Sequence, residues 1–164
     1  TWQFAKAQFI AEKHDWTKFV SMQNHLNLLY REEEREMIPF CEDQKIAITP
    51  YSPLASGRLT RDWTGDTKRS LTDQTSKMKY DQTMDQDRVI VERVAQVAEE
   101  LDVKRAQVAL AWLMQKEVVT VPIIGATKES HLLDALPAID VTLTPEQVAF
   151  LEEPYLPHQV VGAR

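Results

Sequence analysis

Two short segments of this sequence combine residue types that suit the binding of a phosphate group. Residues 46–57 (IAITPYSPLASG) and 121–128 (VPIIGATK) each begin as an apolar run and end in small, polar or glycine-bearing residues. A glycine-containing turn after a strand lets backbone N–H groups approach an anion closely. Two such junctions in a chain of alternating strands and helices favour a nucleotide or sugar-phosphate site.

The first segment also places an aromatic ring at the end of its strand. Tyr51 can stack on a flat cofactor ring, and Ser52 with the N–H groups after it can reach a phosphate. Pro50 and Pro53 fix φ on either side of this corner and make it stiff. A proline-rich turn around a core tyrosine is the alternative, and two prolines flanking one aromatic residue favour the binding role.

The second segment ends a strand and opens a helix. Thr127 is its predicted helix cap, and Lys128 adds a full positive charge to the partial charge of the helix N-terminus. A plain capped helix explains the same residues, and short motifs of this kind often match by chance. Earlier in the chain, Gln23 and Asn24 follow a short strand, where their amides can hold a planar carboxamide or simply cap the strand end.

The region between the two segments has its own charge pattern. From residue 58 to residue 79, six basic residues stand against three acidic ones, although the whole chain has a formal net charge of −6. Local positive charge suits an anionic ligand beneath a closing loop, and it also suits a simple solvated surface. The residues are Arg58, Arg61, Lys68, Arg69, Lys77 and Lys79, with Asp62, Asp66 and Asp73.

Hydrophobic periodicity predicts the elements that position these residues. It predicts strands and helices in alternation, with one long irregular loop at residues 50–86. Strands separated only by helices run parallel, which predicts an α/β fold with covering helices. Three apolar strands alone leave open edges, so further strands are expected to complete the sheet. The strands are predicted at 19–23, 46–49 and 118–124, and the helices at 2–13, 32–43, 87–101, 105–115, 129–136 and from 144, where Thr144 and Gln147 form a capping box.

Composition excludes several classes of protein. The net charge argues against nucleic acid as a partner, because a phosphate backbone needs a basic surface. No apolar stretch reaches the ~20 residues that cross a bilayer. The single cysteine, Cys41, favours a reducing, cytoplasmic location, and the histidines lack metal-ligand spacing, which predicts no metal site. His25, Cys41 and His158 are assigned structural or surface roles.

Four blocks of residues together resemble the aldo-keto reductase family, and their order and spacing cover nearly the whole chain. The resemblance implies the C-terminal part of a (β/α)₈ TIM barrel that binds NADPH across the carboxyl ends of its strands. The chain is then expected to supply strands six to eight and loop 50–86 of a single barrel over residues 1–164, with the N-terminal half absent. The blocks are 19–24 (FVSMQN), 51–57 (YSPLASG), 106–113 (AQVALAWL) and 122–126 (PIIGA), and residues 30–36 with the tail at 154–158 most resemble an enterobacterial member.

The resemblance also implies a role for particular residues. Gln23 matches the residue that holds the nicotinamide carboxamide, and Tyr51 matches the aromatic residue that stacks on the nicotinamide ring. Arg61 or Arg58 matches the basic residue that closes over the pyrophosphate. At position 131 this chain has His where the family often has Arg or Gln. The turn that carries the pyrophosphate corresponds to Ser52, Pro53, Leu54, Ser56 and Gly57, and the segment around the adenosine 2′-phosphate and adenine corresponds to Gly125, Thr127, Lys128, His131 and Asp134.

The family's catalytic Asp, Tyr, Lys and His lie on earlier strands and have no counterpart in this chain, so no catalytic residue is assigned here. The implied reaction is reduction of a small aldehyde, ketone or sugar-derived carbonyl, with the proton coming from the tyrosine. Two alternatives stay open. One is a cofactor-binding regulatory subunit without catalysis, and the other is a sugar-phosphate enzyme without nicotinamide.

Overall fold

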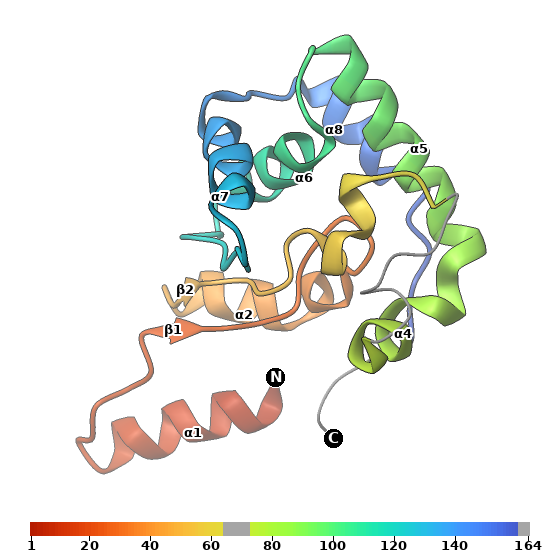
Figure 1. Ribbon diagram of the computed structural model, residues 1–164. Helices are drawn as coiled ribbons and strands as arrows, with labels where there is room; N and C mark the ends of the chain where they lie inside the picture. The colour runs from red at the N-terminus through yellow and green to blue at the C-terminus, as the bar shows by residue number, and fades with distance from the viewer. Residues whose placement is uncertain (64–72, 161–164) are drawn as a thin grey trace.

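The computed structural model describes residues 1–63 and 73–160 of this 164-residue chain. It is a helix-rich α/β structure in which a small parallel sheet lies below a group of helices (Figure 1). The α-helices are α1 Trp2–Lys13, α2 Met37–Asp43, α4 Gln74–Tyr80, α5 Met84–Glu100, α6 Arg105–Met114, α7 Glu129–Ala135 and α8 Pro145–Glu152. The strands are β1 Ser21–Met22 and β2 Ala47–Ile48, and the 3₁₀ helices are η1 Glu32–Arg35, η2 Ala55–Thr60, η3 Asp81–Thr83 and η4 Leu136–Asp140.

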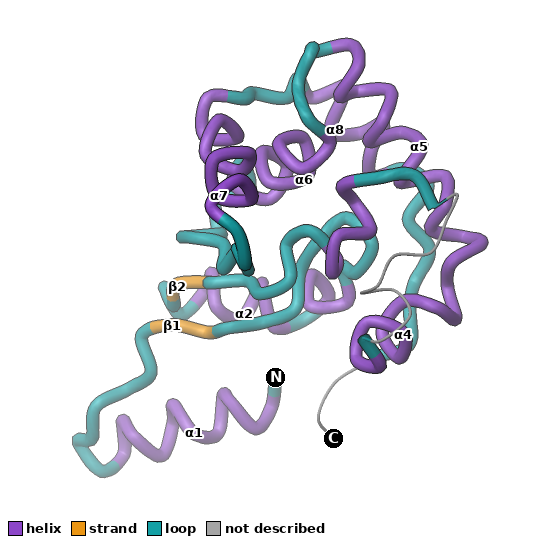
Figure 2. Tube along the Cα trace, viewed as in Figure 1, coloured by secondary structure: helices purple, strands orange, loops and turns teal. Residues whose placement is uncertain are grey.

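The predicted parallel order of the strands is confirmed. β1 and β2 pair in parallel, with Ser21 opposite Ala47, and both are short, as the orange segments of Figure 2 show. The third predicted strand runs parallel to β2 through isolated bridges, where the N–H of Ile123 donates to the carbonyl of Pro50 at 2.8 Å. It forms no continuous strand, and Pro122, which has no N–H to donate, interrupts the ladder. All three segments end at one edge of the sheet.

The prediction of one irregular loop at residues 50–86 is wrong within the described residues. Residues 55–60 form η2, and Asp73 caps α4 by accepting a hydrogen bond from the N–H of Ser76 at 2.9 Å. α4 is polar in composition, but it forms because Tyr80 at its end is fully buried in the core. Residues 64–72, which carry Asp66, Lys68 and Arg69, lie outside the described residues.

Two further predictions need correction. The helix predicted at 32–43 is two elements, η1 and α2, separated at Glu36 with φ of −146°. Pro39 explains the break, because its ring would clash with the carbonyl four residues before it in a continuous helix, whereas it fits the first turn of α2. The cap position of α7 is Lys128 rather than Thr127, and no side chain caps that helix.

Most helices pack around a main core that includes the fully buried Trp112 of α6 and Leu151 of α8, and α7 and η4 pack on α6 through a smaller cluster of Leu110, Ala135 and Ala138. Residues 107–113 of α6 are all buried, and six of these seven residues are apolar, which suits a helix enclosed by its neighbours. The predicted capping box of α8 is confirmed: the N–H of Gln147 donates to Thr144 Oγ1 at 3.2 Å, and the N–H of Thr144 donates to Gln147 Oε1 at 2.9 Å. This capping box fixes where α8 begins.

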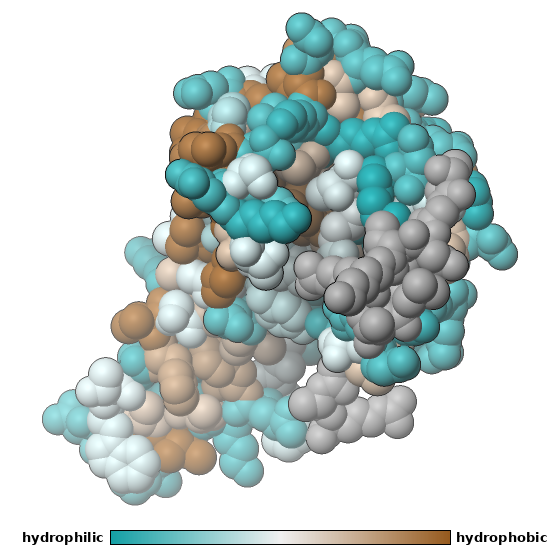
Figure 3. All heavy atoms as spheres, in the orientation of Figure 1, coloured by the Kyte–Doolittle hydropathy of each residue, from teal (hydrophilic) through white to brown (hydrophobic). Residues whose placement is uncertain are grey.

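Several apolar side chains on or beside the strands are exposed, because no other described residue covers them. Phe19 and Val20 before β1 are 58% and 76% exposed, and Val121 is 52% exposed. Figure 3 shows apolar surface along the side of the molecule formed by α7 and the strands. These exposed side chains agree with the expectation that three strands alone leave the sheet incomplete.

The three residues assigned structural or surface roles are all buried: Cys41 is fully buried, His25 is 3% exposed and His158 is 8% exposed. Over residues 1–63 and 73–160, no helix is both long and apolar enough to cross a bilayer. In the same ranges, no group of three or more His, Cys, Asp or Glu side chains could hold a metal ion.

Candidate functional site

A pocket of about 920 Å³ opens at the strand ends, where Tyr51 and Ile123 form a parallel bridge. The ends of the second and third strand segments are therefore adjacent and lie at the same edge of the sheet, as the sequence predicted. The pocket is bounded by residues 51–60, the end of α5, the start of α6, residues 123–126 and α7. The predicted site residues that line it are Tyr51, Ser52, Pro53, Leu54, Ser56, Gly57, Gly125, His131 and Asp134.

Backbone strain is concentrated in the turn that follows Tyr51. Ser52, Ala55 and Ser56 have φ of 58°, 48° and 57°, in the left-handed region that non-glycine residues rarely adopt, and Gly57 has φ of 88°. Such conformations cost on the order of 1 kcal/mol each and persist where the surroundings determine them. Here Asn27 Nδ2 donates to the carbonyl of Ser52 at 2.9 Å. A strained turn held at a pocket wall is typical of a binding site.

The far wall comes from residues that the sequence analysis did not single out. The last turn of α5 contributes Glu99, the turn after α5 contributes Asp102, and the start of α6 contributes its cap residue Lys104 and its first residue Arg105. Two cations at a helix N-terminus oppose the helix dipole, which favours anions there. In the sequence, this pair of basic residues at the start of a helix could have indicated the wall, because two cations there need an acidic partner or a bound anion nearby.

Both cations have acidic partners. Lys104 pairs with Asp134 of α7, and Arg105 Nη1 lies 2.7 Å from Asp62 Oδ1. The hydrogen bond and charge of Arg105 hold the pKa of the exposed Asp62 carboxyl below its ordinary value. These ion pairs connect α7 and the turn after η2 to the start of α6, so salt bridges join three segments around the pocket. The Glu99 and Asp102 side chains on the same wall offset the positive charge of Lys104 and Arg105.

The structure places five predicted site residues outside the lining of the pocket. Arg58 is buried, pairs with Asp81, and lies 5.6 Å from the ring centres of both Trp63 and Tyr80. Its cation is therefore engaged inside the 55–81 region rather than in the pocket. Gln23 is exposed beyond β1, and the remaining three are Arg61, which is half-buried, and the exposed Thr127 and Lys128.

Two side chains, His25 and Lys79, lie against the Tyr51 ring. Its ring stacks on that of His25, with centres 5.0 Å apart and planes at 15°. The Lys79 ammonium lies 4.5 Å from the centre of the Tyr51 ring and 3.5 Å from its hydroxyl. Burial raises the pKa of Tyr51 and lowers that of Lys79. Nearby Asn24 is 5% exposed, and neither its amide oxygen nor its nitrogen has a hydrogen-bond partner among the described residues.

Protonation of His25 gives the first testable consequence. Burial, together with the charges of Lys79 and His158, lowers the pKa of His25 from 6.5 to about 3. Between these values the unfolded chain binds a proton that the folded chain does not, so stability falls as pH decreases. We expect the free energy of unfolding to drop by roughly 1–2 kcal/mol more in the wild type than in His25→Phe between about pH 6.5 and pH 4. Urea unfolding at several pH values measures this difference, and equal pH slopes for the two proteins would contradict it.

Comparison with known proteins identifies the family. The family model described as "Aldo/keto reductase family" matches residues 1–155. A Schizosaccharomyces pombe protein provisionally named an aryl-alcohol dehydrogenase is 44% identical over 98% of this chain and 45% of its own length. The versiconal hemiacetal acetate reductase of Aspergillus parasiticus is 40% identical over 97% of this chain and 47% of its own. An aldo-keto reductase of Metarhizium robertsii is 42% identical over 99% of this chain and 44% of its own length.

The chain thus spans a little under half the length of these fungal relatives. The likeness to an enterobacterial member stays a prediction. The family match extends from the first helix to Tyr155 and includes every segment that lines the pocket. The family also implies a (β/α)₈ barrel, which agrees with the parallel strand segments and the helices between them. This chain belongs to the aldo/keto reductase family.

Proposed function

We propose that this chain is the cofactor-binding C-terminal part of a (β/α)₈ reductase that uses NADPH to reduce an aldehyde, ketone or sugar-derived carbonyl in the cytoplasm. In this proposal β1, β2 and residues 119–124 are the last three strands of the barrel. The observation that carries it is the pocket at their carboxyl ends, which is where barrel enzymes build their sites. The exposed apolar side chains Phe19, Val20 and Val121 are the positions that preceding strands would cover.

The residues of the pocket fit a dinucleotide. A flat aromatic ring, Tyr51, stands at one end, and the strained turn from Ser52 to Gly57 forms the wall beside it. Within this turn the N–H groups of Ala55 and Gly57 donate to the carbonyls of Ser52 and Leu54, so Leu54 and Ser56 would offer their N–H groups to a phosphate. The start of α6, a helix of 10 residues, supplies further N–H groups and a positive dipole end. Phosphate binding would therefore rest mainly on the backbone, because Lys104 and Arg105 are already paired with carboxylates.

The cofactor supplies the hydride when it is bound, and this chain supplies its position. Tyr51 would hold the nicotinamide ring by stacking. Gln23, at the end of β1, would hold the carboxamide through its paired donor and acceptor. Turn 52–57 would hold the pyrophosphate, and His131 and Asp134 of α7 would face the adenosine end. The proton donor would come from strands that precede these residues, so the chain by itself orients the cofactor without completing the reaction.

The test compares the full-length protein with the 164-residue chain. We expect the full-length protein to oxidise NADPH when a simple aldehyde is added and the 164-residue chain to show no turnover, as followed by NADPH absorbance. In the full-length protein, Tyr51→Ala should raise the dissociation constant for NADPH about tenfold, because a stacked pair contributes about 0.5–1.5 kcal/mol. Gln23→Ala should also weaken binding, with little change in thermal unfolding for either variant.

The outcomes separate this proposal from its alternatives. NADPH binding without turnover by the full-length protein would favour a regulatory subunit. Absence of NADPH binding would favour an enzyme that uses the same loops for a substrate phosphate. Turnover by the 164-residue chain alone would refute the proposed division of roles. His14→Ala, which removes an exposed ring stacked on Trp16, is the control and should leave NADPH affinity unchanged.

A further inference from the structure

A continuous row of aromatic rings connects the C-terminal tail to the pocket. Tyr155 stacks on His158 with ring centres 5.4 Å apart, and His158 meets the edge of Tyr30 at 6.2 Å. Tyr30 stacks on His25 at 4.2 Å, and His25 stacks on Tyr51 at 5.0 Å, both with planes at 15°. The row therefore ends on Tyr51, whose ring lines the pocket beyond the end of β2. Its members come from three separate parts of the chain.

The tail end of this row is fixed by polar contacts. His158 Nε2 lies 2.9 Å from Asp87 Oδ1, and the backbone N–H of His158 donates to Glu32 Oε1 at 2.7 Å. The side chains of His158 and Asp87 are 2% and 1% exposed. The Tyr155 hydroxyl donates to the same Glu32 oxygen at 2.7 Å and accepts from the N–H of Arg31 at 2.9 Å. The tail is therefore held against α5 and against the segment that follows Tyr30.

The middle of the row is buried and hydrogen-bonded to α4. His25 is 3% exposed and Tyr30 is 1% exposed. A hydrogen bond of 2.8 Å joins His25 Nε2 to the hydroxyl of Tyr80, the last residue of α4. Asn27 Nδ2 lies 3.2 Å from the same nitrogen and also donates to the carbonyl of Ser52. The strained turn and the row of aromatic rings are thus joined by the same hydrogen bonds, so the orientation of the His25 ring is coupled to the conformation of the turn.

We propose that His25 and Tyr30 are positioning residues that fix the height and tilt of the Tyr51 ring in the pocket, with the C-terminal tail bracing them through His158. This inference rests on the proposed function, in which Tyr51 stacks on the nicotinamide. A ring held in its binding orientation loses less conformational entropy when a ligand stacks on it. A rigid backing on one face of Tyr51 therefore strengthens binding of the ring end of the cofactor and leaves the adenosine end unaffected.

The experiment compares two probes on the full-length protein. NADPH reaches the nicotinamide position, whereas 2′,5′-ADP carries only the adenosine end and the 2′-phosphate. We expect His25→Ala to raise the dissociation constant for NADPH about tenfold, measured by quenching of tryptophan fluorescence, and to leave that for 2′,5′-ADP within about twofold of the wild type. His25→Phe keeps a flat ring in the row and should restore NADPH binding to within about threefold of the wild type.

Two further variants make the test decisive. Tyr30→Leu removes the ring behind His25 but keeps apolar volume, so it should show the same selective loss and serves if His25→Ala does not fold. His14→Ala, which also removes a stacked histidine ring but at the exposed cap position after α1, should change neither constant. Equal weakening of both probes, unchanged NADPH binding in both row variants, or no rescue by His25→Phe would overturn the inference. If the wild type binds neither probe, the proposed function itself fails.

Discussion

Asp87→Ala is expected to lower the free energy of unfolding by about 3–5 kcal/mol. The Asp87 carboxylate is buried at the start of α5, where its Oδ1 lies 2.9 Å from His158 Nε2 and its Oδ2 accepts a hydrogen bond from Thr83 Oγ1 at 2.6 Å. Removing it leaves the buried His158 Nε2 without its partner, takes one of two hydrogen-bond partners from the half-buried Thr83 hydroxyl, and releases the C-terminal tail from α5. Urea unfolding at neutral pH, followed by tryptophan fluorescence, measures the loss.

Asp85→Ala is the matched control for this prediction. Asp85 lies two residues earlier in the first turn of the same helix, but its side chain is exposed. Its removal should cost less than about 1 kcal/mol, because only the interaction with the helix dipole is lost. Asp87→Asn, which keeps the shape and one acceptor, should fall between the two. A loss of under about 1 kcal/mol for Asp87→Ala would show that the tail does not depend on this contact.

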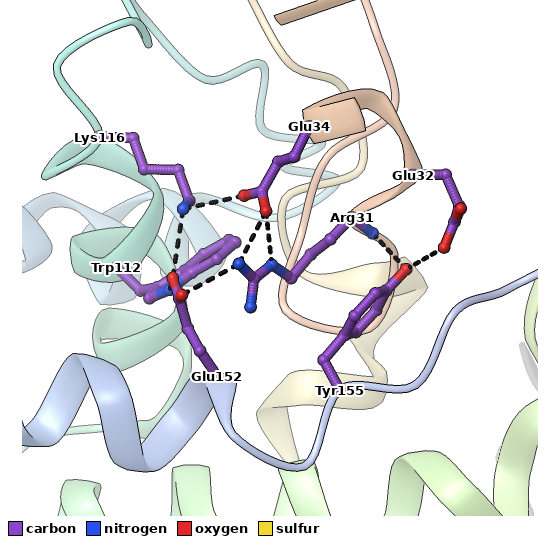
Figure 4. A network of polar contacts seen from close by, with 7 residues as sticks. All are labelled: Arg31, Glu32, Glu34, Trp112, Lys116, Glu152 and Tyr155. Atoms are coloured by element: carbon purple, nitrogen blue, oxygen red, sulfur yellow. Dashed lines mark hydrogen bonds and ion pairs between the residues drawn. The ribbon is translucent and has the colours of Figure 1, made fainter. Parts of the chain in front are cut away.

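Glu152→Ala is expected to produce the second large effect, a loss of about 2–3 kcal/mol. Glu152 of α8 lies 2.9 Å from Arg31 Nη2 and 3.2 Å from Lys116 Nζ, and it accepts a hydrogen bond from Trp112 Nε1 at 2.8 Å (Figure 4). Without it, Glu34 is the remaining carboxylate partner of both cations among the described residues, and the indole N–H of the fully buried Trp112 has lost its acceptor.

The pH dependence of this contribution has a definite sign. Burial acts to raise the pKa of Glu152, but the charges of Lys116 and Arg31 and the hydrogen bond from Trp112 prevail and hold it below its ordinary value. The contribution is therefore present above the ordinary glutamate pKa and is lost as pH falls through the lowered folded-state pKa. Unfolding experiments on the wild type and Glu152→Ala should give converging stabilities in acid and a constant difference near neutral pH.

Glu153→Ala gives the comparison for a surface pair. Glu153 is the next residue along, its side chain is 73% exposed, and it lies 2.6 Å from Arg93 Nη1. Exposed pairs of this kind contribute about 0–1 kcal/mol, so Glu153→Ala should be close to the wild type. A similar cost for both glutamates would mean that burial of the Arg31–Glu34–Lys116–Glu152 network adds nothing to its strength.

Local patterns predicted much of the fold. The periodicity of α5 and α6, the capping box at Thr144 and Gln147, and the parallel order of the strand segments could all be derived from residues close together in sequence. The two pocket walls at residues 51–57 and 123–126 followed in the same way, because the carboxyl ends of parallel strands meet at one edge of a sheet. Errors arose where one residue overrode the pattern, as Pro39 and Pro122 did.

Only the tertiary structure decided the rest of the site. The third wall, formed by Glu99, Asp102 and the start of α6, lies far in sequence from Tyr51, and Arg58 turned inward to Asp81 instead of facing the pocket. The aromatic row joins His25 to His158, two histidines that have no shared pattern in the sequence. Composition and periodicity indicate which residues must be buried, whereas contacts between distant residues depend on how the helices pack over the sheet.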